Sequence, residues 1–304
     1  MAPRVLTARH LNRALLDRQL LLERSRLPIA EAIEQVGGLQ TQYAPSGYVG
    51  LWTRLADFGR PALTAALKEH MVIQATLIRT TIHMVSRREF WPYAMGVREP
   101  RRRWALRIPA TAAGRGGEAA MLEAAERMRD ALADGPKSVK ELGQLGAGFV
   151  GNLGLWVDLV RVPPSGTWER RRADILGLAE TWVGPSDATE GEGLTHLVRA
   201  YLRAFGPAAW RDIAAWAGIS IEEAKSGGGQ LTLTEYRDEA GRLLVDLEGA
   251  TLAEPDAAAP VRFLPHWDAN LLVHARRAGI LPEAFRSRVF HVRDRKSTRL
   301  NSSH

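Results

Sequence analysis

The sequence has no cysteine in its 304 residues, which excludes disulfide bonds, thiolate metal sites and a cysteine nucleophile. It also lacks any apolar run approaching the roughly 18 residues that a transmembrane helix needs. The first residues contain no continuous apolar segment of the kind that a signal peptide requires. We therefore expect a cytoplasmic protein with no membrane partner.

Common cofactor and metal motifs are missing as well. There is no Gly-x-Gly-x-x-Gly after a strand, no phosphate-binding loop and no His-Glu-x-x-His pair. The eight histidines are scattered along the chain. The sequence therefore predicts neither a cofactor nor a metal site.

Positive charge is in excess, with 41 Lys and Arg against 34 Asp and Glu, for a net charge of +7. Arginine strongly outnumbers lysine, which favours forked contacts to phosphate groups. This balance favours a polyanionic partner such as nucleic acid. The alternative is a GC-rich genome, which enriches arginine in every protein.

The last eleven residues, 294–304, show no apolar periodicity and no relation to the preceding sequence. They look like an in-frame translation of a common sequencing-library adapter, and such segments are excluded from fold reasoning. We therefore expect the natural chain to continue past Arg293. The alternative is an ordinary disordered polar tail.

Three segments repeat the order helix, turn, helix and strand, at 1–108, 119–183 and 194–248. Thr7, Ser138 and Ser220 are expected helix N-caps, and the two serines are followed three residues later by glutamate, as in a capping box. β-Branched and apolar residues from 76 to 85 predict a strand, and Pro-Pro-Ser-Gly at 163–166 predicts the turn of a two-stranded wing. Residues 109–118, 184–193 and 249–260 are candidate linkers, and 249–293 begins a further β-containing region.

The third segment shows the pattern most clearly. Helices are expected at 195–205 and 208–217, a short helix follows Ser220, and alternating apolar residues predict a hairpin over 231–247. Helix, turn, helix and hairpin is the order of a winged helix. The sequence thus predicts a mainly α fold with small β wings (α+β), built from tandem winged-helix domains that form a concave DNA-binding surface.

The segment from Gly37 to Pro45 is the most suggestive of chemistry. Two glycines end one helical pattern and Pro45 delays the next helix, so Gln40 to Gln42 are expected to be extended. Residues two apart in an extended chain face the same side, so Gln40 and Gln42 would present two carboxamides together. Such a pair could hold a water or a sugar hydroxyl, but it could not act as a strong base. The alternative is two solvated loop glutamines.

Several stretches form a further pattern: residues 30–42, with Gly37-Gly38-Leu39-Gln40-Thr41-Gln42, then 48–55, 78–85, 197–202 with 205–208, and Leu264-Pro265-His266-Trp267-Asp268 with 271–272. These stretches resemble the family of winged-helix DNA glycosylases typified by AlkZ and YcaQ. Their order and spacing extend the resemblance over almost all of residues 1–293.

The resemblance implies a DNA glycosylase of tandem winged helices that excises alkylated purines, chiefly N7-alkylguanine, with interstrand crosslinks unhooked by some members. A glutamine-x-glutamine motif lies in the active site of the AlkZ-like branch, and it maps onto Gln40 and Gln42. The YcaQ-like branch has an acidic residue at the second position. Thr41 departs mildly from the apolar or small residue that is common between the two glutamines. The family also continues into C-terminal β structure that residues 294–304 replace here.

The expected chemistry needs only weak polar groups. An N7-alkylated guanine already carries a positive charge, so it is a good leaving group, and positioning a water near C1′ of the sugar could suffice. We hypothesise that Gln40 and Gln42 are catalytic and position this water in a monofunctional glycosylase. We expect a monomer that acts on double-stranded DNA carrying alkylated bases, in the nucleoid, for DNA repair or self-resistance.

Other residues are candidate DNA contacts, chosen as basic groups or from the family-like stretches. Arg79 and His83 would share a strand face and meet phosphate or the lesion edge, although buried structural roles are an equal alternative. The remaining candidates are Arg101, Arg102 and Arg103 in a basic run, Arg170 and Arg171 after the second wing, and Asp268, whose role the sequence does not reveal.

Two other functions remain open from the residues. One is a non-catalytic winged-helix DNA-binding protein or transcription regulator, and the other is a protein that binds damaged DNA without cutting it. Glu222 and Glu223 place negative charge in the first turn of the expected recognition helix. That charge argues against reading of base edges, and so against a sequence-specific regulator.

Overall fold

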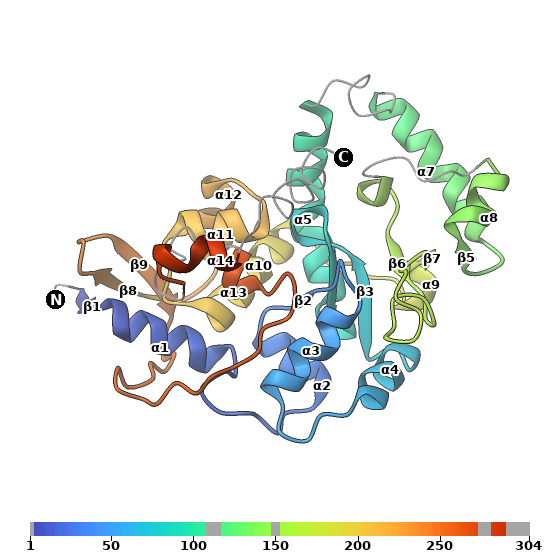
Figure 1. The fold of residues 1–304 in the computed structure, drawn as a ribbon. Helices are drawn as coiled ribbons and strands as arrows, with labels where there is room; N and C mark the ends of the chain where they lie inside the picture. Colours follow the sequence, from blue (N-terminus) through green and yellow to red (C-terminus); the bar gives the residue numbers. More distant parts are fainter. Residues whose placement is uncertain (1–2, 108–116, 147–152, 273–280, 290–304) are drawn as a thin grey trace.

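Helices surround two small β-sheets in a mixed α/β fold (Figure 1). The computed structural model describes residues 3–107, 117–146, 153–272 and 281–289. The tail at 294–304 and most of the expected linker at 109–118 lie outside the described residues. Within the described ranges, every helix is too short or too polar to cross a lipid bilayer.

Short strands alternate with helices along the described chain. The strands are β1 (Arg4–Leu6), β2 (Leu39–Gln40), β3 (Val72–Thr76), β4 (Ile82–Ser86), β5 (Lys137–Ser138), β6 (Leu159–Arg161), β7 (Ile175–Leu178), β8 (Leu233–Asp238) and β9 (Leu243–Leu247). The α-helices are α1 (Ala8–Arg18), α2 (Ile29–Gln35), α3 (Pro45–Arg54), α4 (Arg60–Lys68), α5 (Arg87–Arg107), α7 (Glu118–Leu132), α8 (Val139–Gln144), α9 (Ala179–Trp182), α10 (Glu190–Phe205), α11 (Trp210–Ala217), α12 (Ile221–Gly228), α13 (Ala269–Leu272) and α14 (Arg286–Val289). Single 3-10 turns are η1 (Ile78–Thr80), η2 (Leu153–Leu155) and η4 (Glu283–Phe285).

The larger sheet has six strands in the order β2-β4-β3-β6-β7-β5. Its centre is the antiparallel pairing of β3 with β6, in which Gln74 lies opposite Arg161 and Ala75 opposite Val160. The strands of the first two expected units therefore form one sheet rather than two separate wings. In the smaller sheet, β1 runs parallel to β8, which pairs antiparallel with β9. The division into three units stays a prediction. The pairing of β3 with β6 joins the first and second expected units, and the pairing of β1 with β8 joins the first and third.

Helices α5 and α10 cross at the centre of the molecule, between the β8–β9 hairpin at one end and α7 and α8 at the other (Figure 1). A β-carbon on Gly96 would come within 2.5 Å of the carbonyl oxygen of Gly193, so the two backbones approach as only glycine allows. Buried Tyr93, Leu197 and Trp216 pack in the core around this crossing. The crossing holds the first and third expected units against each other.

Local signals in the sequence identify several helix starts. Thr7, Ser138 and Ser220 are confirmed as N-caps, each accepting a hydrogen bond from the backbone N–H three residues later. Helix α10 begins at Glu190 rather than at 195, because Thr189 forms a further capping box with Glu192 inside the expected linker.

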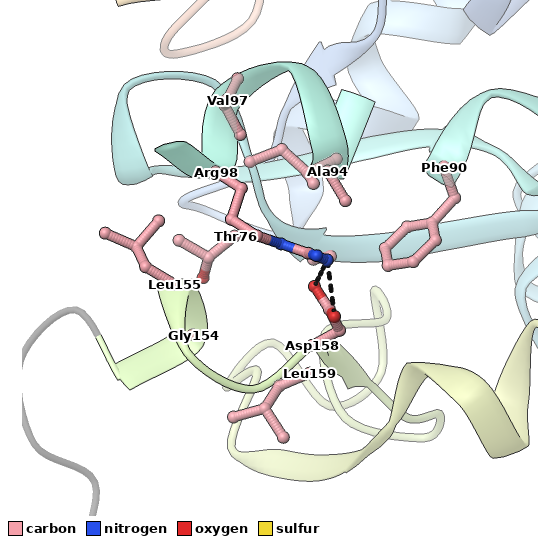
Figure 2. Close-up of a pocket in the computed structure, with 11 residues that line it drawn as sticks. Thr76, Phe90, Ala94, Val97, Arg98, Gly154, Leu155, Asp158 and Leu159 are labelled. Atoms are coloured by element: carbon pink, nitrogen blue, oxygen red, sulfur yellow. Dashed lines mark hydrogen bonds and ion pairs between the residues drawn. The ribbon is translucent and has the colours of Figure 1, made fainter. Parts of the chain in front are cut away.

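A small pocket lies where α5 passes over β3 and faces η2 and β6 (Figure 2). Its charged groups are Arg98 and Asp158, whose guanidinium Nη2 and carboxylate oxygens are 2.8 and 2.7 Å apart. The charge of each group is already offset by that of the other. The pocket therefore offers little to a substrate, although its ion pair fastens α5 to the second expected unit.

Candidate functional site

The glutamine pair lies at the edge of the larger sheet. Gly37 and Gly38 take left-handed φ angles of 76° and 82° and end α2, and β2 then pairs antiparallel with β4. The backbone N–H of Thr41 continues this ladder by donating to the carbonyl of Ile82 at 2.7 Å. Thr41 is buried while its neighbours are half-buried and exposed, so the two glutamine side chains do lie on the other side of the strand, away from the core.

Both carboxamides are held by the same short segment, residues 79–82. Arg79 Nη2 donates to Gln40 Oε1 at 2.9 Å, and the backbone N–H of Ile82 donates to Gln42 Oε1 at 3.2 Å. Because both partners can only donate, the oxygen of each carboxamide must face them. Each oxygen keeps a second lone pair, and neither Nε2 group has a hydrogen-bond partner among the described residues. The arrangement leaves donors and acceptors for a ligand.

The strand expected over 76–85 is wrong in its middle, where the structure has the turn that holds the glutamines. Residues 77–81 form a tight turn in which Arg79 and Thr80 take left-handed φ angles of 53° and 57°. Residues other than glycine adopt this conformation at a cost of about 1–3 kcal/mol each, and such strain concentrates at functional sites. Arg79 therefore lies in the turn and does not share the face of β4 with His83.

Two arginines, Arg79 and Arg101, lie at the turn that holds the glutamine pair. Arg79 Nη1 donates to the carbonyl of Trp216 in the last turn of α11 at 2.5 Å, where a cation is favourable. Arg101 Nη2 donates to Thr80 Oγ1 at 2.6 Å, and its guanidinium lies 4.2 Å from the ring centre of Trp104. Burial lowers the pKa of Arg79 to about 10, with a smaller contribution from the charge of Arg101, and burial lowers the pKa of Arg101 to about 10. Both stay charged at neutral pH.

The other expected DNA contacts are spread over the molecule. Arg102 donates to the carbonyl of Leu155 at 2.5 Å and pairs with Glu99, while Arg103 pairs with Glu223 of α12. These two arginines thus contact protein groups and do not converge on the glutamines. Arg170 and Arg171 are exposed in the loop between β6 and β7, where Arg170 forms an ion pair of 3.2 Å with Asp174.

Asp268 is buried against α3. Its Oδ2 forms an ion pair of 2.9 Å with Arg54 of α3, and both side chains are only 1% exposed. Its Oδ1 accepts from the side-chain amide of Asn270 at 2.8 Å. In this structure Asp268 fixes the loop at 265–268 against α3 and does not reach the surface.

His83 is also buried, opposite Gln40 in the β2–β4 register, and its Nδ1 lies 3.0 Å from the carbonyl of Thr81. Burial, and to a smaller extent the charge of Arg79, lower the pKa of His83 to about 3. The folded protein therefore keeps His83 neutral, whereas the unfolded chain binds a proton below pH 6.5. Stability consequently falls as the pH falls from about 6.5 toward 3.

This gives a testable pH dependence. The variant His83→Asn keeps a donor for the Thr81 carbonyl but has no titrating group. Between pH 7.5 and 5.0, wild type should lose about 2 kcal/mol more unfolding free energy than His83→Asn. Urea denaturation at both pH values measures the difference, and equal losses would show that His83 is not buried as a neutral ring.

Thr41 makes a buried contact of its own. Gln74 Nε2 donates to Thr41 Oγ1 at 2.9 Å, and both side chains are almost fully buried. The isosteric variant Thr41→Val would leave the Gln74 amide without this acceptor, so we expect a loss of about 1–3 kcal/mol of unfolding free energy. Denaturation by urea tests this, with Thr41→Ser as the control that retains the hydroxyl. Equal stability of Thr41→Val and wild type would contradict the hydrogen bond.

Sequence reasoning missed Tyr43, which follows the glutamine motif, and His266, which contacts it. Tyr43, directly after Gln42, is 40% exposed, and His266 lies edge-on to it with ring centres 6.0 Å apart. Adjacency to the glutamine motif was the available signal for Tyr43, and the family-like stretch at 264–268 was the signal for His266. Among the described residues, no three His, Asp or Glu side chains are grouped in a way that could hold a metal ion.

The chain matches the family model described as DNA glycosylase AlkZ-like over residues 33–300. A solved structure, the DNA glycosylase AlkZ of Streptomyces sahachiroi, is similar with a TM-score of 0.69 at 18% sequence identity, covering 80% of this chain and 70% of that chain. That likeness shows a common fold. No curated protein matches the chain by sequence. Because the family model covers most of the chain, this protein belongs to the AlkZ-like family of DNA glycosylases.

Proposed function

We propose that the protein hydrolyses the N-glycosidic bond of alkylated purines in double-stranded DNA, chiefly that of N7-alkylguanine. The observation that carries the proposal is that Arg79 in the left-handed turn and Ile82 just after it orient the carboxamide oxygens of Gln40 and Gln42. Bulky adducts and interstrand crosslinks are further proposed substrates, in repair or in self-resistance to a DNA-alkylating compound.

The proposed step uses the glutamines to orient a water molecule. The second lone pair of each carboxamide oxygen accepts a hydrogen of this water, which places the water oxygen at C1′ of the sugar. As the C1′–N9 bond breaks, the base leaves with the bonding electrons and loses its positive charge. The water oxygen bonds to C1′, and the proton that it releases goes to solvent, because a neutral carboxamide is too weak a base to keep it.

The proposed DNA surface combines the expected tandem winged helices into a concave face. Arg171 is exposed and supplies charge for backbone phosphates, and Arg170 does so once its exposed ion pair with Asp174 opens. Arg79 and Arg101 add positive charge at the turn that holds the glutamines. Such contacts bind DNA without reading its sequence. We propose that the protein acts as a monomer on DNA in the nucleoid, without a metal or cofactor.

The direct test is incubation of the purified protein with duplex DNA carrying N7-methylguanine. We expect release of free N7-methylguanine and abasic sites that alkaline treatment converts to strand breaks. Undamaged duplex of the same sequence is the control. Binding to the methylated duplex without release of base would support a damage-binding protein instead and would overturn the proposed reaction.

A further inference from the structure

Tyr43 occupies a distinctive position beside the glutamine pair. It follows Gln42 directly and precedes Pro45, the first residue of α3, and the backbone N–H of Ser46 donates to its carbonyl at 2.8 Å. Tyr43 is 40% exposed, although large aromatic residues are usually more buried than this. The chain thus places a partly exposed aromatic residue directly after the glutamine motif.

Two other loops fix this ring in place. Arg171 Nη1 donates to the Tyr43 hydroxyl at 3.2 Å, and its guanidinium lies 5.9 Å from the Tyr43 ring centre. From another element, the His266 ring meets Tyr43 at an interplanar angle of 85°. Ring and cation contacts of this kind restrict the tyrosine rotamer before any ligand arrives.

The two supporting side chains are themselves anchored. Arg171 also lies 5.7 Å from the ring centre of Trp168, which packs edge-on against buried Tyr48 of α3. His266 belongs to the 265–268 loop that the buried Asp268–Arg54 ion pair fastens to the same helix. Segments far apart in the sequence therefore converge to hold one exposed ring.

We propose that Tyr43 is a stacking platform for a nucleobase of the DNA substrate, with the exposed guanidinium of Arg171 placed for a phosphate of the same strand. This inference rests on the proposed function, because it assigns a nucleotide to the glutamine site. A π-face accepts any base, so the platform holds DNA without reading sequence, whereas the glutamines act at the sugar. Tyr43 and Arg171 are thus binding and positioning residues.

The test compares Tyr43→Leu, which removes the ring, with Tyr43→Phe, which removes only the hydroxyl bonded to Arg171. Both are titrated with a duplex that carries a stable abasic-site analogue flanked by the fluorescent base 2-aminopurine. Tyr43→Leu should weaken binding by about 5- to 150-fold and lose the quenching of 2-aminopurine that stacking causes. Tyr43→Phe should keep the quenching and most of the affinity.

Trp52→Leu is the matched control. Trp52 is 46% exposed and lies under Arg24 at 5.1 Å, so it is also an exposed aromatic ring beside an arginine. Trp52 follows Gly50 by two residues, which is a rotation of about 200° around α3. Gly50 faces Leu39 and Pro265. Trp52 therefore points away from the glutamine strand, and its replacement should change neither affinity nor quenching.

Three results would each contradict the proposed role of Tyr43. Tyr43→Leu could bind and quench like wild type, or Tyr43→Leu and Trp52→Leu could have equal effects. The third result is that Tyr43→Phe loses as much quenching as Tyr43→Leu. The abasic analogue needs no base release. If the proposed reaction is wrong, wild type releases no N7-methylguanine, but the titration still measures whether Tyr43 stacks on a base. If only the platform fails, base release persists.

Discussion

The double variant Gln40→Ala/Gln42→Ala is expected to release N7-methylguanine from DNA at least about 100-fold more slowly than wild type, the loss typical for removing groups that assist proton transfer and orientation. Duplex affinity should stay within about threefold, because phosphate contacts dominate binding to DNA. Single-turnover release measures the first quantity and fluorescence anisotropy the second.

The single variants separate the two glutamines. Gln40→Ala also removes the acceptor of Arg79 Nη2, so it combines loss of a water ligand with a loosened turn. Gln42→Glu keeps an acceptor for the N–H of Ile82 and should retain more activity than Gln42→Ala. Gln144→Ala and Gln230→Ala remove exposed glutamines elsewhere and should release base like wild type. Unchanged release by a correctly folded double variant would remove the catalytic assignment.

The common orientation of the glutamines was predictable because it depends on local rules. Gly37 and Gly38 must end a helix, Pro45 limits where the next begins, and period-two alternation then aligns Gln40 with Gln42. Buried Thr41 between them completes the alternation. The capping boxes were predictable for the same reason, since each is complete within four residues.

The support behind the glutamines was not predictable, because it depends on contacts between distant residues. The left-handed turn at Arg79 and Thr80 contains no glycine or asparagine, and β-branched neighbours favour a strand there. Arg79 is held in the turn by Gln40 and by Trp216, which is 137 residues away. Pairing of β3 with β6 is equally non-local, and no short pattern encodes it.

Asp268 illustrates the same limit and carries the second large prediction. The variant Asp268→Ala should lose about 3–5 kcal/mol of unfolding free energy, because it leaves the guanidinium of Arg54 buried without its counter-ion. Arg54 Nη2 would retain only its hydrogen bond to Gln19 Oε1, at 3.1 Å. Urea denaturation monitored by tryptophan fluorescence measures the loss.

Two comparisons isolate the cause as an uncompensated buried charge. The double variant Arg54→Met/Asp268→Leu removes both charges and should recover most of the lost stability, since well-packed apolar residues often replace a buried ion pair without cost. Asp158→Ala breaks the ion pair with Arg98, whose side chains are 20% and 18% exposed, so water can solvate the remaining arginine and the loss should be smaller. If Asp268→Ala is no less stable than Asp158→Ala, Arg54 does not depend on Asp268, and the loop that carries His266 must be held to α3 by other contacts.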